Sequence, residues 1–307
     1  MKCLIAVLCL GILLPAVVLS NIAGRGFISA VQEAPEETSA QTSPAAEPTK
    51  ICVLQDDALA EMDIEDYLVG VLLCEMPTDF HPEALKAQAV VARTYTLRRC
   101  LEADKHESGA VCTNSDCCQG YRDPGEYPDE EGVKKAAEAV QATAGAVLMY
   151  GDDLIEATYF SCSGGMTEDA VAVWGEDVPY LQAKKSPGEE QASHFCDTVH
   201  YSLQEFQKRL QITPEGPAES WITDITYTQG GGVDTAKICG TVFTGVELRK
   251  RLNLRSTAMI LTAIGDTVTV TTRGFGHRVG MSQYGAEAMA AEGNDYQQIL
   301  TYYYDGA

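Results

Sequence analysis

The stretch DIEDYLVGVLLCEMPTDFHPEALKAQAVVARTY, residues 63–95, predicts two consecutive helices separated by a short turn. Asp63 can cap a first helix over residues 64–76, because its side chain can accept hydrogen bonds from N–H groups of the first turn. Pro77 ends this helix, since proline cannot continue the hydrogen-bond pattern. A second helix follows Pro82, from residue 83 to about 99. Its small apolar residues predict close packing against a neighbouring element.

Glu75 continues an apolar stripe on the first of these helices. The other members of the stripe are Ile64, Leu68, Val71 and Leu72. Their spacing puts them on the same helix face as Glu75. Burial and the negative end of the helix both disfavour a carboxylate, so both are expected to raise the pKa of Glu75. A competing interpretation is a glutamate bonded to local backbone where the helix ends, and the helix pattern alone favours that one.

The remaining pattern predicts an α+β fold. Further helices are expected over residues 132–143, 282–291 and 296–304. Strands are expected over 51–54, 147–150, 154–160, 222–228, 260–263 and 267–271, the last two joined by a turn at Gly265-Asp266. We therefore expect the helices that carry Glu75 to pack against a mostly antiparallel β region, with a cleft between them.

The N-terminal part predicts export. The run from Cys3 to Leu19 is uncharged and mostly apolar, and seventeen helical residues span about 25 Å. This indicates a signal peptide or a signal anchor over residues 1–23, and the missing A-x-A cleavage pattern favours the anchor. Residues 24–50 are rich in Ala, Pro, Glu, Thr and Ser, which predicts a flexible linker. Residues 51–307 would then form a domain outside the cytoplasm, carried by a single-pass membrane protein.

Charge excludes one broad class of partner. The formal net charge is −22 and the isoelectric point is about 4.5. A nucleic-acid-binding domain requires a basic patch, so no nucleic acid is expected as a partner. The acidity is also typical of a highly soluble chain.

Three motifs combine into a recognisable series. The first is CEMPTDFHPEALKAQAVVARTY, residues 74–95. The second is YFSCSGG, residues 159–165, followed by Val173-Trp174 and Pro179-Tyr180-Leu181. The third is RGFGHRVGMSQYGAEAMAAEGNDYQQILTYYYDGA, residues 273–307. In this order, the three motifs resemble the stage II sporulation protein D family, which includes an amidase enhancer, over nearly all of residues 51–307.

The resemblance implies a lytic transglycosylase that cleaves peptide-stripped peptidoglycan strands during sporulation engulfment. In the family's E-M-P motif the glutamate is the catalytic acid, which is Glu75 here. One carboxyl suffices, because the C6 hydroxyl of muramic acid attacks its own C1 and leaves a 1,6-anhydro end. The resemblance also implies partners: a sporulation peptidoglycan amidase, which would supply peptide-free strands, and a membrane scaffold protein.

Polar residues of the three motifs are the candidate substrate-binding groups. They are Lys86, Gln88, Arg93, Tyr159, Ser161, Ser163, His277, Ser282, Gln283 and Tyr284. Several have competing structural interpretations. Lys86 and Arg93 can belong to a solvated face, and the glycines of YFSCSGG can simply form a turn. Ser282 can cap the following helix, and His277 can be a buried, hydrogen-bonded histidine instead of a group that orients Glu75 or binds substrate.

A His/Cys cluster suggests zinc. His106, Cys112, Cys117 and Cys118 follow the second helix, but the spacing is not that of a standard zinc finger. Some members of the family carry zinc on a His and two Cys spaced six apart, which selects His106, Cys112 and Cys118. Cys117 is expected to point away, because neighbouring side chains diverge in extended chain. The metal would be structural, and the alternative is a disulfide such as Cys112 to Cys118.

Two rival functions remain. A non-catalytic module of the same fold could bind glycan and stimulate a peptidoglycan amidase, although a binder has no need for a carboxyl on an apolar stripe. A thiol or zinc hydrolase could use Cys162 or the cluster, but no histidine stands at motif spacing from Cys162. Nine cysteines remain outside the N-terminal run, an odd number, so they cannot all pair within one chain.

Overall fold

The computed structural model describes residues 50–55, 58–106, 109–213 and 215–307, all within one compact unit. The expected anchor (1–23) and nearly all of the expected linker (24–50) lie outside these ranges; Lys50 already begins a strand. Within the described ranges, none of the helices has both the length and the apolar character that a membrane span requires.

The two leading helices form as the sequence predicts. Helix α1 (Ile64–Glu75) is capped by Asp63, whose carboxylate accepts from the Glu65 N–H at 2.9 Å. It ends where Met76 turns to an extended conformation. Helix α2 (Pro82–Glu102) begins one residue earlier than expected, with Pro82 in its first turn, and continues to Ala103, which adopts the left-handed conformation.

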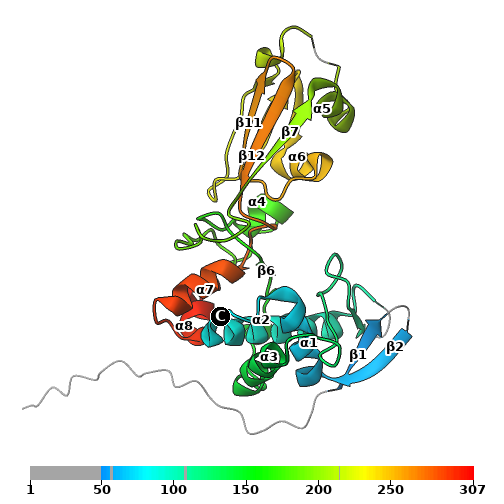
Figure 1. Ribbon diagram of the computed structural model, residues 1–307, viewed down its shortest axis with the longest axis vertical. Helices are drawn as coiled ribbons and strands as arrows, with labels where there is room; N and C mark the ends of the chain where they lie inside the picture. Colours follow the sequence, from blue (N-terminus) through cyan, green and yellow to red (C-terminus); the bar gives the residue numbers. More distant parts are fainter. Residues whose placement is uncertain (1–49, 56–57, 107–108, 214) are drawn as a thin grey trace, which may run out of the picture. The chain divides into compact units, whose positions relative to one another are not determined.

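A helical core contains both ends of the described chain. Helices α1 and α2 contact α3 (Glu130–Ala142), and α2 also contacts α7 (Gln283–Ala291) and α8 (Tyr296–Tyr303) (Figure 1). Beside them, β1 (Lys50–Gln55) pairs antiparallel with β2 (Ala58–Asp63) and parallel with β3 (Val111–Cys112). Ile51 and Val53 from β1 are buried in the same cluster as Tyr303 and Tyr304.

A second core lies among strands. Strands β7 (Cys196–Ser202), β11 (Met259–Ile264) and β12 (Thr267–Arg273) form an antiparallel sheet in the order β11-β12-β7. A smaller sheet has the order β10-β9-β8, with β8 at Ile222–Thr223, β9 at Thr235–Ile238 and β10 at Thr241–Thr244. Helices α5 (Leu203–Leu210) and α6 (Gly245–Leu252) contact each other, and a short 3-10 helix, η2 (Ala218–Ser220), contacts β11. In β11, alternate residues are buried and exposed, as its sequence predicts.

Short elements bring two motifs together. Strand β6 (Tyr159–Phe160) pairs parallel with β13 (Met281–Ser282), so YFSCSGG lies beside the third motif. A five-residue helix, α4 (Ala170–Trp174), follows β6. Most of the strand pairs are antiparallel, and the α+β class is confirmed.

Three predicted strands are shorter than expected, the first being 147–150, of which only Met149 and Tyr150 belong to a strand. Of the stretch 154–160, only Leu154 belongs to β5 (Asp153–Leu154), and only Tyr159 and Phe160 belong to β6. Strand β5 pairs with β4 (Met149–Tyr150). Between β5 and β6, backbone groups form hydrogen bonds with other segments of the chain. The Ile155 N–H donates to the Leu148 carbonyl, and the Thr158 carbonyl accepts from the Met281 N–H and the Tyr304 hydroxyl. Strand β8 stops after Thr223, because Asp224 has φ +48° and leaves the extended conformation.

Candidate active site

A cavity of about 880 Å³ receives side chains from all three motifs. Glu75 enters it from the first motif, Tyr159 and Ser161 from the second, and His277 and Gln283 from the third. Tyr95, Arg98 and Arg99 line it from α2, and Trp174 lines it from the end of α4. The cavity therefore collects residues from distant parts of the chain around one carboxyl group.

Glu75 is the last residue of α1, and its carboxylate is held from a neighbouring loop. The Gly120 N–H donates to Glu75 Oε1 at 2.7 Å. Burial raises the pKa of Glu75 above that of an ordinary glutamate, while hydrogen bonds from the Gly120 N–H and the Tyr159 hydroxyl offset part of this effect. The net direction is upward, which favours the proton-carrying form that a general acid needs.

Gln119 and Gly120 are site residues that the sequence did not reveal. Gln119 is buried; its Nε2 donates to the Tyr159 hydroxyl at 3.2 Å, and its Oε1 accepts from the Thr96 hydroxyl at 2.7 Å. At Gly120, a Cβ would lie 2.6 Å from Cys74 Sγ and 3.1 Å from Glu75 Oε1, so the close approach requires glycine. A Gln-Gly pair directly after Cys117-Cys118 was the available signal, but it has no periodic pattern.

His277 is held as a neutral ring against the cavity. Its Nδ1 accepts from the Val279 N–H at 3.1 Å, and it also hydrogen-bonds the backbone of Tyr159. Burial, assisted by the charge of Arg249, lowers the pKa of His277 to about 4. The imidazole is therefore uncharged near neutral pH, with its ring against Phe160 and Trp174 at centroid distances of 5.7 and 5.5 Å.

The other predicted residues of the second and third motifs divide into two groups. Ser161 and Gln283 line the cavity with Tyr159 and His277. Ser282 is buried and caps α7, accepting from the Gly285 N–H at 3.2 Å, and Ser163 is buried and donates to Glu189 at 2.9 Å. Tyr284 packs its ring on Phe80 at 5.1 Å. Ser163, Ser282 and Tyr284 are not among the residues that line the cavity.

Lys86, Gln88 and Arg93 from the first motif do not line the cavity either. Lys86 pairs with Glu83 at 2.6 Å. Gln88 is fully buried and accepts from Gln283 Nε2 at 3.4 Å, so it contacts the cavity only through that residue.

Arg93 connects three helices from within. It is 1% exposed, donates twice to Glu65 of α1, and donates to the carbonyls of Val140 and Ala146, at and beyond the end of α3. These contacts are internal to the protein. The substrate-binding roles expected for Lys86 and Arg93 stay predictions.

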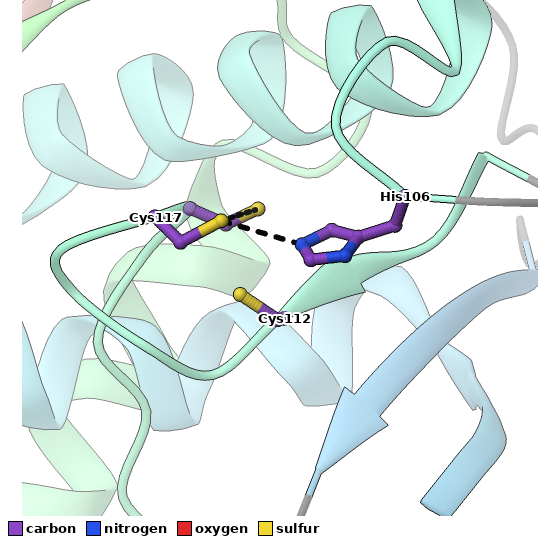
Figure 2. A group of neighbouring side chains, drawn as sticks. His106, Cys112 and Cys117 are labelled. Atoms are coloured by element: carbon purple, nitrogen blue, oxygen red, sulfur yellow. Dashed lines mark hydrogen bonds between the residues drawn. The ribbon is translucent and has the colours of Figure 1, made fainter. Parts of the chain in front are cut away.

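The His/Cys cluster adjoins the cavity and has four members. His106, Cys112, Cys117 and Cys118 place their ligand atoms within 4.8 Å of one another. Cys117 Sγ lies 3.4 Å from His106 Nε2 and 4.0 Å from Cys118 Sγ. Figure 2 shows the side chains of His106, Cys112 and Cys117 converging on one point. A tetrahedral zinc site, with Zn–S about 2.3 Å and Zn–N about 2.0 Å, needs ligand atoms about 3.5–3.8 Å apart. The donor set and its spacing therefore fit a metal of this class.

The expectation that Cys117 lies apart is wrong. The chain there is turned and not extended: the N–H groups of Cys117 and Cys118 both donate to the Asn114 carbonyl, at 3.0 and 2.9 Å. A turn allows neighbouring side chains to converge on one point. None of the nine cysteines in the described part of the chain forms a disulfide, so the cluster offers three thiols.

Cys162 has no catalytic environment. It is fully buried and donates to Glu189 at 3.0 Å. Burial raises the pKa of the Cys162 thiol far above its usual range, and the charge of Glu189 raises it further. A thiolate nucleophile is therefore disfavoured at this position.

Comparison with known proteins agrees with the arrangement of the motifs. The family model described as "Stage II sporulation protein" matches residues 55–150. Stage II sporulation protein D of Bacillus subtilis (strain 168) is 38% identical over 88% of this chain and 84% of its own length. The protein of the same name from Bacillus amyloliquefaciens is 37% identical over 88% of this chain and 80% of its own length. An amidase enhancer of Bacillus subtilis (strain 168) is 32% identical over 78% of this chain and 39% of its own length. The chain belongs to the stage II sporulation protein D family.

Proposed function

We propose that this chain is a peptidoglycan lytic transglycosylase with Glu75 as its acid and base. The observation that supports the proposal is the Glu75 carboxyl, with its raised pKa, in a large cavity assembled from three separate motifs. Family membership places the chain among sporulation proteins. The proposed substrate is the bond between N-acetylmuramic acid and N-acetylglucosamine in peptide-stripped strands.

The reaction needs one carboxyl group. Protonated Glu75 donates its proton to the glycosidic oxygen as the bond to muramic C1 breaks. The C6 hydroxyl of the same muramic acid then attacks C1, and the Glu75 carboxylate accepts the hydroxyl proton. The products are a 1,6-anhydro end and a free hydroxyl on the leaving sugar, and Glu75 returns to its starting state. The Gly120 N–H and the Tyr159 hydroxyl stabilise the carboxylate between the two proton transfers.

Other carboxylates in the cavity make hydrolysis the competing reaction. Glu156 is bound by Arg98 and Arg99, so it is already neutralised by two guanidinium groups. Asp116 and Glu176 are exposed and line the same cavity. A glycoside hydrolase would use one of them to attack C1 or to activate water.

Product analysis separates the two reactions. The full chain is incubated with peptide-free glycan strands beside Glu75→Gln, and the products are read by mass spectrometry. Anhydro-muramic ends from the unaltered protein alone support the transglycosylase. Reducing ends would indicate hydrolysis with a second carboxylate. Strand binding with no cleavage would contradict both.

The similarity to an amidase enhancer favours a second candidate. In that function the cavity would bind glycan without cleaving it and stimulate a peptidoglycan amidase. Glu75→Gln distinguishes the two, because amidase stimulation by a binder does not depend on a titrating carboxyl. Equal stimulation by both forms, without anhydro products, would favour the enhancer.

We propose zinc as the occupant of the His/Cys cluster. His106, Cys112 and Cys118 are the predicted ligands, and Cys117 is the fourth residue that the structure adds. Four protein ligands would close the coordination sphere, so the metal would act as a structural crosslink of the loop. Elemental analysis should find about one zinc per chain, and less than about a tenth of an equivalent at a pH that keeps thiolates available would contradict the assignment.

The setting proposed for this activity is sporulation engulfment. The N-terminal segment would anchor the chain in the cell membrane, with the catalytic domain outside the cytoplasm. An amidase that removes stem peptides and a membrane scaffold protein are the proposed partners. Membrane fractionation of sporulating cells, followed by protease treatment of intact protoplasts, tests this location; protection from protease would contradict it.

A further inference from the structure

Trp174 is an exposed aromatic side chain on the wall of the active-site cavity. It is the last residue of α4, is 44% exposed, and lines the same cavity as Glu75. The chain has one other tryptophan, Trp221, which is 5% exposed within the second core. Leaving an indole in water forgoes the free energy of its burial. An exposed indole that faces a cavity with a catalytic carboxyl suggests a ligand that covers it.

The surroundings of Trp174 hold the indole in place. At the start of α4, the Ala170 N–H donates to the Leu181 carbonyl at 3.1 Å; at its end, the Gly175 N–H donates to the Val171 carbonyl at 3.0 Å. The imidazole of His277 lies 5.5 Å from the indole, and its own hydrogen bonds fix its orientation. The indole is therefore presented to the cavity already positioned, which reduces the entropy cost of binding.

Phe275 is a second exposed aromatic residue in the same cavity. The residue is 39% exposed, although its backbone is fixed by paired hydrogen bonds with Cys162 of 2.7 and 3.2 Å. His194 packs on the ring at 5.2 Å and the Arg255 guanidinium lies 5.7 Å from its centroid. Single exposed apolar residues are common on proteins, but here two positioned aromatic rings line one cavity in which a polar reaction is proposed.

We propose that Trp174 is the stacking platform of a sugar-binding subsite, and that Phe275 supports a neighbouring subsite of the same glycan. The C–H face of a pyranose ring is apolar and matches the π face of an indole, whereas its hydroxyl and acetamido groups at the rim can bind polar cavity residues. The class of ligand is a β-1,4-linked N-acetylhexosamine chain. This inference rests on the proposed function and extends it by naming where the strand binds away from the scissile bond.

The test uses a chito-oligosaccharide and the full chain carrying Glu75→Gln, so that binding is measured without cleavage. Calorimetry should show that adding Trp174→Ala weakens the Kd about tenfold or more, which is about 1.4 kcal/mol. Trp174→Tyr should retain most of the affinity. Tyr227→Ala removes an aromatic side chain that is 57% exposed and not part of the cavity, and it should leave the Kd unchanged.

Fluorescence gives a second readout, which would not change if Trp174 had only a structural role. The probe should shift the emission of Trp174 to shorter wavelength, because the sugar removes water from the indole. The shift should vanish in Trp174→Tyr, whose remaining Trp221 is buried in the second core. On cleavable strands, in the protein with Glu75 intact, Trp174→Ala should raise KM more than it lowers kcat, as expected for a contact remote from the reacting bond.

The outcomes separate this inference from the proposed function. An unchanged Kd in Trp174→Ala, with strand cleavage intact in the unaltered protein, overturns the platform and leaves the transglycosylase standing. Loss of probe binding in Trp174→Ala, in a protein that never cleaves strands, supports the platform and overturns the activity. No binding of the probe to the parent protein overturns the platform. A matching unfolding midpoint for each variant shows that it is folded.

Discussion

In the proposed reaction, Glu75 combines two demands at a single residue, because it must hold a proton and also give it up. Its pKa is raised mainly by burial, so the folded chain releases this proton at a higher pH than the unfolded chain does. Folding is then disfavoured by Glu75 above the ordinary glutamate pKa of about 4.3, because ionisation costs more in the folded state.

Replacing Glu75 should therefore have opposite effects on activity and stability. We expect Glu75→Gln to lower turnover about 10²- to 10⁴-fold, the usual contribution of a general acid. The same variant should unfold at a higher temperature than the parent at neutral pH, with the difference vanishing below the unfolded pKa. Thermal melts across pH and product assays provide the measurements. Glu130→Gln, at an exposed site in the first turn of α3, serves as a control and should change neither quantity appreciably.

The pH dependence of the reaction follows from the same residue. Only the protonated Glu75 can donate, so kcat/KM should fall as pH rises through its raised pKa. His277, with its pKa lowered to about 4, stays neutral over that range and should not add a second step near its usual pKa of about 6.5. An initial-rate profile with an additional step near pH 6.5 that His277→Asn removes would contradict this assignment.

Arg93 and Lys86 should differ sharply when truncated. Arg93 is buried and pairs with Glu65, so Arg93→Ala leaves internal partners unsatisfied and should cost about 3 kcal/mol or more of unfolding free energy. Lys86 pairs with Glu83 at a partly exposed position, so Lys86→Ala should cost less than about 1 kcal/mol. Denaturant titrations measure both. Equal stability of the two variants, with activity lost only in Arg93→Ala, would indicate a direct role of Arg93 in substrate binding.

At the scale of elements, the loop over residues 117–120 joins the His/Cys cluster to the Glu75 carboxyl. Cys117 and Cys118 belong to the cluster, Gln119 binds Tyr159, and Gly120 binds Glu75. Four consecutive residues therefore contribute both to the His/Cys cluster and to the hydrogen bonds around Tyr159 and Glu75. A displacement of this loop would alter the hydrogen bonds on Glu75 directly.

Gly120→Ala tests that connection. The added methyl would overlap Cys74 Sγ and press on Glu75 Oε1, so the loop or the carboxyl must shift. We expect turnover to fall about tenfold to a hundredfold, the scale on which misplaced catalytic groups act, while the chain remains folded. Gly125→Ala is the matched control, because its new Cβ would meet only the Asp123 carboxylate, at 3.2 Å. Equal activities of the two variants would show that the Gly120 contact does not position Glu75.

Sequence patterns predict those helices and strands whose signals lie within the element itself, such as caps, turns and alternating apolar residues. Helices α1 and α2 have caps, prolines and many apolar residues, and β11 and β12 alternate around a two-residue turn. Strand β7 was not predicted, because its partner β12 lies about seventy residues later and its outer face carries Thr198 and His200. Helix α6 was also missed, although Thr244 and Glu247 form a capping box that marks its start.

The candidate site was predictable only where a motif names the residue. Glu75, Tyr159, Ser161, His277 and Gln283 come from the motifs and line the cavity together. Ser163 and Ser282 share the same motifs but make internal hydrogen bonds, a distinction that only the tertiary structure reveals. Cys117 was excluded by an argument for extended chain, whereas the Asn114 turn reverses the chain locally.

At the scale of the whole molecule, removal of the proposed metal should loosen the helical core. Cys112 belongs to β3, which pairs with β1, and Val111 is part of that core. A chelator is therefore expected to lower the unfolding temperature of the full chain and to reduce turnover, because binding energy of the metal contributes to folding. Scanning calorimetry with and without chelator measures the first effect, and re-addition of zinc should reverse it. An unchanged melt would contradict a structural metal.

The helical core also determines when the protein can finish folding. Ile51 and Val53 at its start share one cluster with Tyr303 and Tyr304, whereas the second core draws on residues 199–270 alone. A ribosome therefore completes the second core first and must synthesise the chain through Tyr304 before the helical core can close. Until then the apolar side chains of α1 and α2 remain exposed, where chaperones can bind them and where they promote aggregation. Ending the chain at residue 295, before α8, should leave the second core protected from hydrogen exchange and the helical core unprotected. The Glu75 site would then mature only after the second core has folded.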